Sequence, residues 1–144
     1  MYQVLTNGGS LTTTTSYVTV PNLSLPVAAG VTYHFSAYLT YQASATTSIF
    51  QPTMGGTCTA SVVTYQVRIQ TNVNGASNSQ VQAALGLPAT PAGSAPNAAT
   101  TTYGAVIDGV IDVSAAGTLD VQVKHATSAS TVQAGGIYLL EQVA

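Results

Sequence analysis

The sequence predicts an all-β protein, a jelly-roll-like β-sandwich of about eight strands with at most one short helix near residues 78–85. Apolar and polar residues alternate with a period of two in several segments, which gives a strand one buried and one solvated face. Turns rich in glycine, proline and asparagine separate these segments. Strand and helix patterns do not alternate along the chain, which excludes a parallel α/β fold.

The N-terminal part begins with short β-prone segments. Residues 2–5 are extended, either as a first strand or as an arm that reaches a neighbour, and residues 1–9 are treated as a candidate N-terminal arm. Residues 17–20 alternate until Pro21 and Asn22, where we expect the strand to end. Leucine and valine then recur at every second position over residues 23–27.

Two longer strands carry the clearest alternation. Residues 31–42 follow a turn at residues 28–30, and residues 59–70 follow the Gly55-Gly56 break. The predicted core face of the first is Val31, Tyr33, Phe35, Ala37, Leu39 and Tyr41, and that of the second is Val63, Tyr65, Val67 and Ile69. His34 and Arg68 fall on the opposite, wet faces.

The segment 72–99 changes character and is predicted to be a long loop insertion, because its three prolines forbid a central strand. Within it, residues 78–85 have the pattern of one or two helical turns. Asn78 would cap that helix, Val81 and Leu85 would share a face, and Gly86 would end it.

The C-terminal part returns to strand patterns. Residues 100–113 place Ile107, Ile111 and Val113 on the core face with Gly109 between them, and residues 119–124 alternate in the same way. The last strand is predicted over residues 132–143. Its run Ile-Tyr-Leu-Leu is apolar on both faces, which is typical of a strand that is central in a sheet or covered by a partner.

The composition favours association with other protein subunits. The chain is 46% hydrophobic but only 4% charged, with a net charge of −2, so it lacks the charge repulsion that keeps monomers apart. Two basic residues, Arg68 and Lys124, are too few to neutralise a row of phosphates, so no nucleic-acid binding is expected. No apolar run is long enough to span a membrane and no secretory signal is visible. The 144 residues fit a single domain.

Three aspartates, Asp108, Asp112 and Asp120, form the one candidate carboxylate cluster. If their two strands form a hairpin with a five-residue loop, Asp112 faces Asp120 and a calcium ion would be needed between them. A three-residue loop instead pairs Asp108 with Gln122. In a jelly roll the two strands can also lie in different sheets, and then neither pairing exists. We expect these aspartates to form the wet face of core strands, without a metal.

The remaining reactive residue types show no catalytic spacing. His34 and His125 lie on separate predicted strands with no cysteine or carboxylate at ligand spacing. His34, on the wet face of its strand, is expected to be a surface or subunit-contact histidine. Cys58 is the single cysteine, which excludes an internal disulfide and predicts a small buried apolar residue. Phosphate-binding and nucleophile-elbow motifs are missing from the sequence. The sequence therefore predicts neither an enzyme nor a cofactor.

Three segments resemble motifs of small β-sandwich domains in tailed-bacteriophage virions. Residues 23–35 resemble the pattern L-x-x-P-V-x-A-G-x-x-Y-x-F, with Tyr41 following, and residues 107–119 resemble I-x-G-x-I-x-x-S-x-A-G-T-L. Residues 131–137 are similar to a closing T-V-x-A-G-S motif, with Gly136 where the pattern usually has serine. The resemblance covers both ends of the chain and leaves residues 43–100 undetermined.

The resemblance implies a jelly-roll subunit of a virion, made in the host cytoplasm. Such domains resemble the trimeric decoration proteins of phage capsids, which implies a homotrimer that binds the major capsid protein at the capsid surface, and similar domains also occur at the ends of tail proteins and fibres. No fibre shaft or heptad repeat precedes the strands, which favours decoration over a fibre tip. Candidate partner contacts are residues of the arm and of the apolar last strand: Tyr2, Val4, Leu5, Tyr138 and Leu140.

Two other functions stay open at this point. The chain can instead be a tail- or fibre-associated adhesin that recognises host-surface glycans through polar loops such as residues 72–100. It can also be a general structural head or tail subunit with neither duty.

Overall fold

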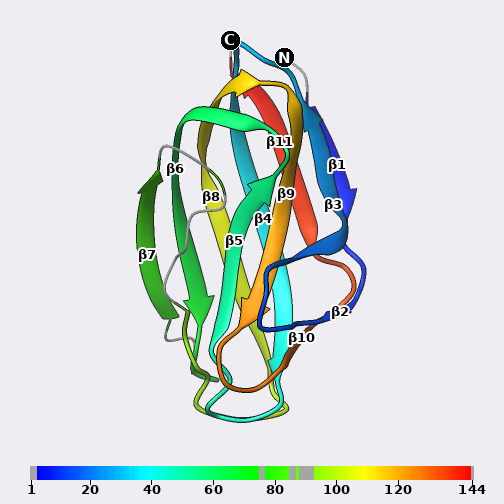
Figure 1. Cartoon of the computed structure of the whole chain (residues 1–144). Coiled ribbons are helices and arrows are strands. Elements are labelled where there is room, and N and C mark those ends of the chain that lie inside the picture. The colour runs from blue at the N-terminus through cyan, green and yellow to red at the C-terminus, as the bar shows by residue number, and fades with distance from the viewer. Residues whose placement is uncertain (1–2, 75–76, 85–86, 88–92, 144) are drawn as a thin grey trace.

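The computed structural model describes residues 3–74, 77–84, 87 and 93–143, and it shows two antiparallel β-sheets packed face to face (Figure 1). The described residues form no helix, so the all-β prediction is confirmed. The large sheet contains β1 (Gln3–Asn7), β2 (Leu11–Thr12), β4 (Val31–Ala43), β6 (Thr59–Gln70), β7 (Ser77–Ala84), β8 (Thr102–Ala115), β10 (Ser130–Val132) and β11 (Ile137–Val143). The small sheet contains β3 (Val18–Val27), β5 (Phe50–Gly56) and β9 (Gly117–His125).

The strand order is that of a jelly roll. When the strands of a jelly roll are lettered B to I along the chain, one sheet has the order B-I-D-G and the other C-H-E-F. The small sheet has the order β3-β9-β5, and an isolated bridge from Phe50 to Ser94 stands where strand G would begin. The large sheet contains β4-β8-β6-β7 in the C-H-E-F positions. The strands β11 and β1 extend this sheet beyond β4.

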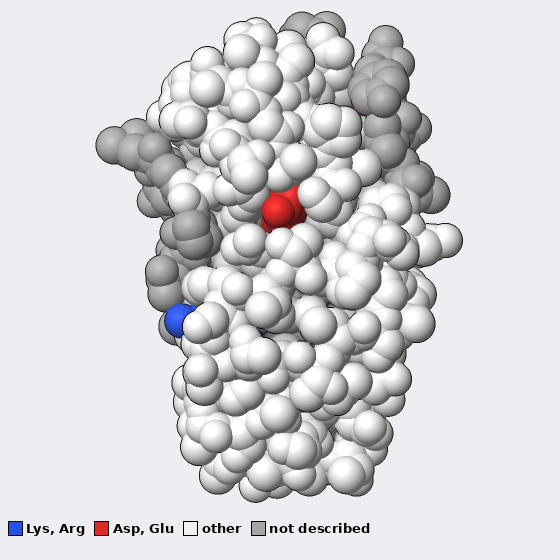
Figure 2. Space-filling model, turned by 45° about the vertical axis from the view of Figure 1, so that its right-hand side comes forward, with Lys and Arg blue, Asp and Glu red and all other residues white. Residues whose placement is uncertain are grey.

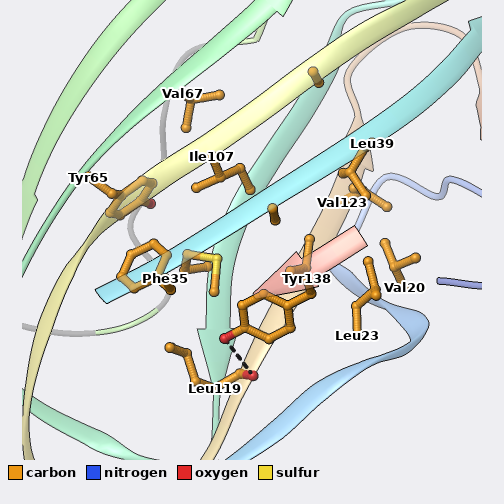
Figure 3. Close-up of a cluster of buried hydrophobic side chains, with 14 of the residues drawn as sticks. Val20, Leu23, Phe35, Leu39, Tyr65, Val67, Ile107, Leu119, Val123 and Tyr138 are labelled. Carbon is orange, nitrogen blue, oxygen red and sulfur yellow. Dashed lines mark hydrogen bonds between the residues drawn. The ribbon is translucent and has the colours of Figure 1, made fainter. Parts of the chain in front are cut away.

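The period-two patterns identify the core correctly. Alternate residues of β4, β6 and β8 are buried against the small sheet, and they include Phe35, Tyr65 and Ile107 (Figure 3). From the small sheet, Leu23, Leu119 and Val123 close the core from the other side. Burial of apolar side chains between two sheets is the main stabilising term of such a sandwich.

The phage-like motifs coincide with turns that join strands. In the first motif, Gly30 has a φ of +74° and its N–H donates to the Val113 carbonyl at 2.7 Å, while the Tyr33 hydroxyl accepts from the Ala28 N–H at 3.0 Å. This turn carries the chain from β3 in the small sheet to β4 in the large sheet. In the second motif, Gly117 packs so closely that a Cβ would lie 2.5 Å from the Cys58 nitrogen.

The third motif also forms a turn. Gly135 has a φ of +95°, and its N–H donates to the Gly8 carbonyl at 2.9 Å. The predicted last strand over residues 132–143 is therefore two strands, β10 and β11, with this turn between them. A left-handed backbone at glycine breaks the ladder, which the apolar pattern alone did not reveal.

The helix predicted near residues 78–85 is wrong. Residues 77–84 form β7, which pairs antiparallel with β6, and Ser79 lies opposite Arg68. Pairing with β6 supplies hydrogen-bond partners for the backbone of β7. This pairing outweighs the weak helix propensity of the segment. The predicted loop over residues 72–99 is therefore interrupted by a strand. Leu85 and Gly86, the end of the predicted helix, lie outside the described residues.

Two further boundaries differ from the prediction. β3 continues through Pro21 and Asn22, because an irregularity between Thr19 and Ser24, with Asn22 at a φ of +65°, absorbs the two residues that we expected to end it. Residues 3–7 form β1, an edge strand paired with β11, which is the first-strand alternative for the N-terminal segment. The described part of the chain contains eleven strands, and it has no helix with the length and apolar character needed to cross a membrane.

Candidate interaction face

The surface of the large sheet that points away from the small sheet, here called the outer face, collects exposed apolar side chains. Among the side chains that the structure describes, six large apolar residues are exposed, and five of them project from this face. They are Tyr38, Val62, Val110, Ile137 and Val143. The sixth, Val73, lies just after β6. A surface strand normally presents polar residues to water, so this concentration indicates a contact surface.

The strand register arranges these side chains in cross-strand rows. Ile137 on β11 lies opposite Tyr38 on β4, and Tyr38 lies opposite Val106 on β8. Val106 in turn lies opposite Arg68 on β6. Directly opposed residues of antiparallel strands are in contact, so this row is a continuous apolar strip that ends at an arginine.

A histidine flanked by two carboxylates lies on the same face. His34 on β4 places its Nε2 atom 3.2 Å from Asp108 Oδ2 on β8 and its Nδ1 atom 3.5 Å from Glu141 Oε2 on β11. The three side chains are partly exposed, with Asp108 at 54%. The contact with two carboxylates was not visible in the sequence, since the three residues are far apart in it and meet only through the strand order.

The three aspartates of the sequence do not form one cluster. Asp108 and Asp112 lie on β8 in the large sheet, whereas Asp120 lies on β9 in the small sheet, so neither hairpin pairing exists. The alternative that places the two strands in different sheets is confirmed. Asp112 accepts a hydrogen bond from Thr32 Oγ1 at 3.3 Å, and Asp120 accepts one from Ser24 Oγ at 2.6 Å. The described residues contain no group of three or more histidine, cysteine, aspartate or glutamate side chains that could hold a metal ion.

Charged groups are sparse over the molecule as a whole. In the view of Figure 2, the acidic and basic atoms form small separate spots in an otherwise uncharged surface.

Lys124 on β9 lies with its Nζ atom 4.5 Å from the ring centre of Tyr17, a cation–π contact. Burial, and then the neighbouring Tyr65, raise the pKa of Tyr17 to about 12.

Two of the predicted partner contacts, Tyr138 and Leu140, are wrong. Their side chains point into the core, where they are 0% and 1% exposed. The Tyr138 hydroxyl donates a hydrogen bond to the Leu119 carbonyl of the small sheet at 3.3 Å (Figure 3), and burial raises its pKa well above the usual value. β11 is covered on one face by its own core, so the residues available to a partner are on the other face, Ile137 and Leu139 among them.

The other predicted contacts belong to the N-terminal segment. The backbones of Val4 and Leu5 pair with Leu140 and Leu139 in the β1–β11 ladder. Their side chains and the whole of Tyr2 lie outside the described residues.

The remaining candidate residues occupy structural positions. Cys58 is 7% exposed, and burial raises the pKa of its thiol. The His125 Nδ1 atom is 3.0 Å from the Thr13 hydroxyl. That hydroxyl also donates to the Ser130 carbonyl and accepts from the Ser130 N–H. The position of Cys58 agrees with the small buried residue that the sequence predicts.

The apolar residues of the outer face were present in the sequence patterns but were not singled out. Val62, Val106 and Val110 occupy wet-face positions of their strands, where polar residues are the norm. Apolar residues at alternate wet-face positions of several strands are a usable signal, but only the strand order shows that they are adjacent.

No protein-family model matches this sequence, and no curated protein is significantly similar to it. Among solved structures, the VP2 subviral particle of infectious bursal disease virus is similar at 10% identity over 99% of this chain and 37% of that chain, with a TM-score of 0.25. The structure of the Gx strain of the same virus gives 8% identity over 98% and 35%, with a TM-score of 0.29. The enzymatically active domain of bacteriophage CBA120 tailspike protein 4 gives 10% over 86% and 19%, with a TM-score of 0.24.

This chain therefore spans 37% of the length of the first of these structures and 19% of that of the tailspike domain.

Proposed function

We propose that this chain is a non-enzymatic structural protein of a tailed-bacteriophage virion, and that it acts as a trimeric decoration protein on the outer surface of the head. The observation that carries the proposal is the outer face. Five exposed apolar side chains lie on one sheet surface. An exposed apolar patch of this kind marks a contact with another protein.

The phage-like motifs support the virion assignment. Their residues form the turns around Gly30, Gly117 and Gly135, which determine how successive strands are joined. The resemblance therefore rests on residues that specify the architecture of the chain. It says less about which virion surface the domain occupies.

The arrangement of titratable groups favours a structural role over catalysis. The His34 imidazole has a carboxylate next to each ring nitrogen, Asp108 at one and Glu141 at the other. A general base needs a ring nitrogen directed at a substrate, and in this arrangement both nitrogens are directed at carboxylates. The cluster also lies on an open sheet face that does not exclude water from a reaction.

The proposed trimer follows from composition and from the family resemblance. With only 4% charged residues, little electrostatic repulsion opposes the approach of identical copies. Closed cyclic assemblies are the usual way in which identical subunits bury such surfaces.

Two measurements test the proposal. Light scattering on the purified protein at micromolar concentration is expected to give the mass of a trimer, and a clean monomer would contradict this part. Expanded phage shells that lack the protein are then mixed with it and pelleted, and the protein is expected to sediment with the shells. Binding to host cells or glycans, without co-sedimentation, would instead identify the chain as an adhesin.

A further inference from the structure

We propose that the outer face is the surface that docks on the shell, and that its partner is a protein surface carrying lysine or arginine among apolar side chains. This inference rests on the proposed function and names the chemistry of the partner site.

The outer face is acidic although the chain as a whole is almost uncharged. Three of the four carboxylates of the sequence belong to it, namely Asp108 and Asp112 on β8 and Glu141 on β11. Its one arginine or lysine is Arg68 on β6, because Lys124 lies on β9 in the small sheet. A chain with four acidic residues has therefore placed three of them among its exposed apolar side chains.

Strand register and hydrogen bonds hold these carboxylates in place. His34 contacts Asp108 and Glu141 from the strand between them, and the Thr32 hydroxyl donates to Asp112. Asp108 keeps 54% of its side chain exposed, so it is accessible to a partner's cation. Pre-ordered charges lose little conformational freedom when they bind, which favours specific pairing.

The neighbouring apolar side chains strengthen the attraction between these carboxylates and the cations of a bound partner. Val110 lies directly opposite His34 on the neighbouring strand, and Asp108 lies between Val106 and Val110 along β8. When a partner covers these side chains, water leaves and the carboxylates interact with opposing cations in a medium of lower dielectric constant. The same burial would be costly against an uncharged surface, because the carboxylates would be left without partners.

A second copy of the same face does not fit this pattern. Two outer faces in contact would bring six carboxylates together with two arginines, and like charges across an interface oppose association. Nucleic acid is disfavoured for the same reason, since its phosphates are also negative. A cyclic trimer joins unlike surfaces of identical subunits, and outside the outer face the chain offers these carboxylates one lysine, Lys124, and no arginine. The trimer contacts are therefore expected on other surfaces of the chain, and the outer face remains available to a different, basic protein.

The test compares charge-neutral variants on the two sheets. Asp108→Asn with Asp112→Asn removes two carboxylates from the outer face, whereas Asp120→Asn removes one from the small sheet. In the shell co-sedimentation assay the double variant is expected to bind about tenfold more weakly than wild type. Its binding is also expected to fall less steeply between about 50 mM and about 500 mM NaCl. Asp120→Asn is expected to bind as wild type does.

Equal binding and equal salt dependence of the double variant and wild type would overturn the inference while leaving the decoration function intact. A loss of the same size in Asp120→Asn would overturn it too, because the effect would not be local to the outer face. Urea unfolding of each variant separates weakened binding from a failure to fold.

A second measurement does not depend on shells. The protein is titrated with an alternating leucine–lysine peptide, and backbone amide shifts are followed by NMR. Changes are expected in β8, β4 and β11 around Asp108 and Glu141, and they are expected to be smaller in the double variant. Should wild type fail to sediment with shells, the proposed function fails and this titration alone decides the inference. Shifts confined to other strands, or none, would refute it.

Discussion

The two faces of the large sheet are built from the same strands but have opposite chemistry. On β8, the core face presents Ile107, Ile111 and Val113, all at most 1% exposed. Its outer face presents Val110, 43% exposed, next to Asp108 and Asp112. Apolar residues occur on both faces, so hydrophobicity alone does not distinguish the face that stabilises the fold from the face that we propose for partner binding.

The two faces differ in whether charged groups lie beside the apolar side chains. In the core, polar side chains are few and uncharged, and the Tyr65 and Thr53 hydroxyls bond to each other at 2.8 Å. On the outer face, apolar side chains stand beside carboxylates that remain partly solvated. Substitutions on the core face should therefore affect stability, and substitutions on the outer face should affect binding.

Alkaline pH provides the largest test of the core face, because tyrosines supply much of it. Burial raises the pKa of Tyr41, Tyr65 and Tyr138, and that of Tyr17 rises to about 12. Phenols in the unfolded chain ionise near pH 10, so between pH 10 and 12 the unfolded state binds fewer protons and stability falls as pH rises.

The expected loss is up to about 1.4 kcal/mol per pH unit for each tyrosine that stays protonated in the fold. Urea unfolding at several pH values measures it. Below about pH 9, where the phenols are protonated in both states, these groups should contribute almost no slope. In Tyr17→Phe the alkaline slope should be shallower, and an unchanged slope would show that Tyr17 does not take part.

Replacing Tyr138 by alanine should destabilise the fold by about 3–5 kcal/mol, since a fully buried ring is removed from the contact between the sheets. Tyr138→Phe keeps the ring and loses only the hydrogen bond to the Leu119 carbonyl, so it should cost about 1 kcal/mol. Denaturant unfolding separates the two variants. A small effect of the alanine variant would mean that β11 is not part of the core.

Glycine-to-alanine substitutions at two positions of β8 test how tightly each face is packed, because each adds one methyl group. On the core face, a Cβ at Gly109 would lie 2.3 Å from the Tyr65 Cβ, so Gly109→Ala should cost about 1–3 kcal/mol. At Gly104 the nearest atom would be Gln70 Oε1 at 3.6 Å, so Gly104→Ala should be close to neutral. Equal costs in thermal unfolding would mean that the two faces are packed alike.

The sequence was sufficient to predict the core and the class of the fold. Strict alternation in residues 31–42 and 59–70 identified side chains such as Phe35 and Tyr65, which the structure buries. A period of two reports directly which side of a strand is dry, without reference to neighbouring strands. The strand at residues 77–84 was not predicted, because its alternation is weak and the strand is stabilised by pairing with β6.

The candidate site was much less predictable. Tyr138 and Leu140 were chosen as contacts because the last strand is apolar on both faces, but the sequence does not say which face meets the core. The contact of His34 with Asp108 and Glu141 depends on the order β11-β4-β8, because these carboxylates lie 74 and 107 positions after His34 in the chain. Long-range strand order is the information that local patterns lack.

A matched pair of valines gives the sharpest comparison of the two faces. Val113→Thr buries a hydroxyl in the core and should cost about 1–3 kcal/mol, whereas Val110→Thr on the outer face should stay within about 0.5 kcal/mol. Both changes keep a β-branched side chain of the same size, so strand propensity is nearly constant. Denaturant unfolding measures the stability of each variant, and shell co-sedimentation measures its binding. Val110→Thr should lower binding while leaving stability unchanged, and binding equal to wild type would remove Val110 from the docking surface.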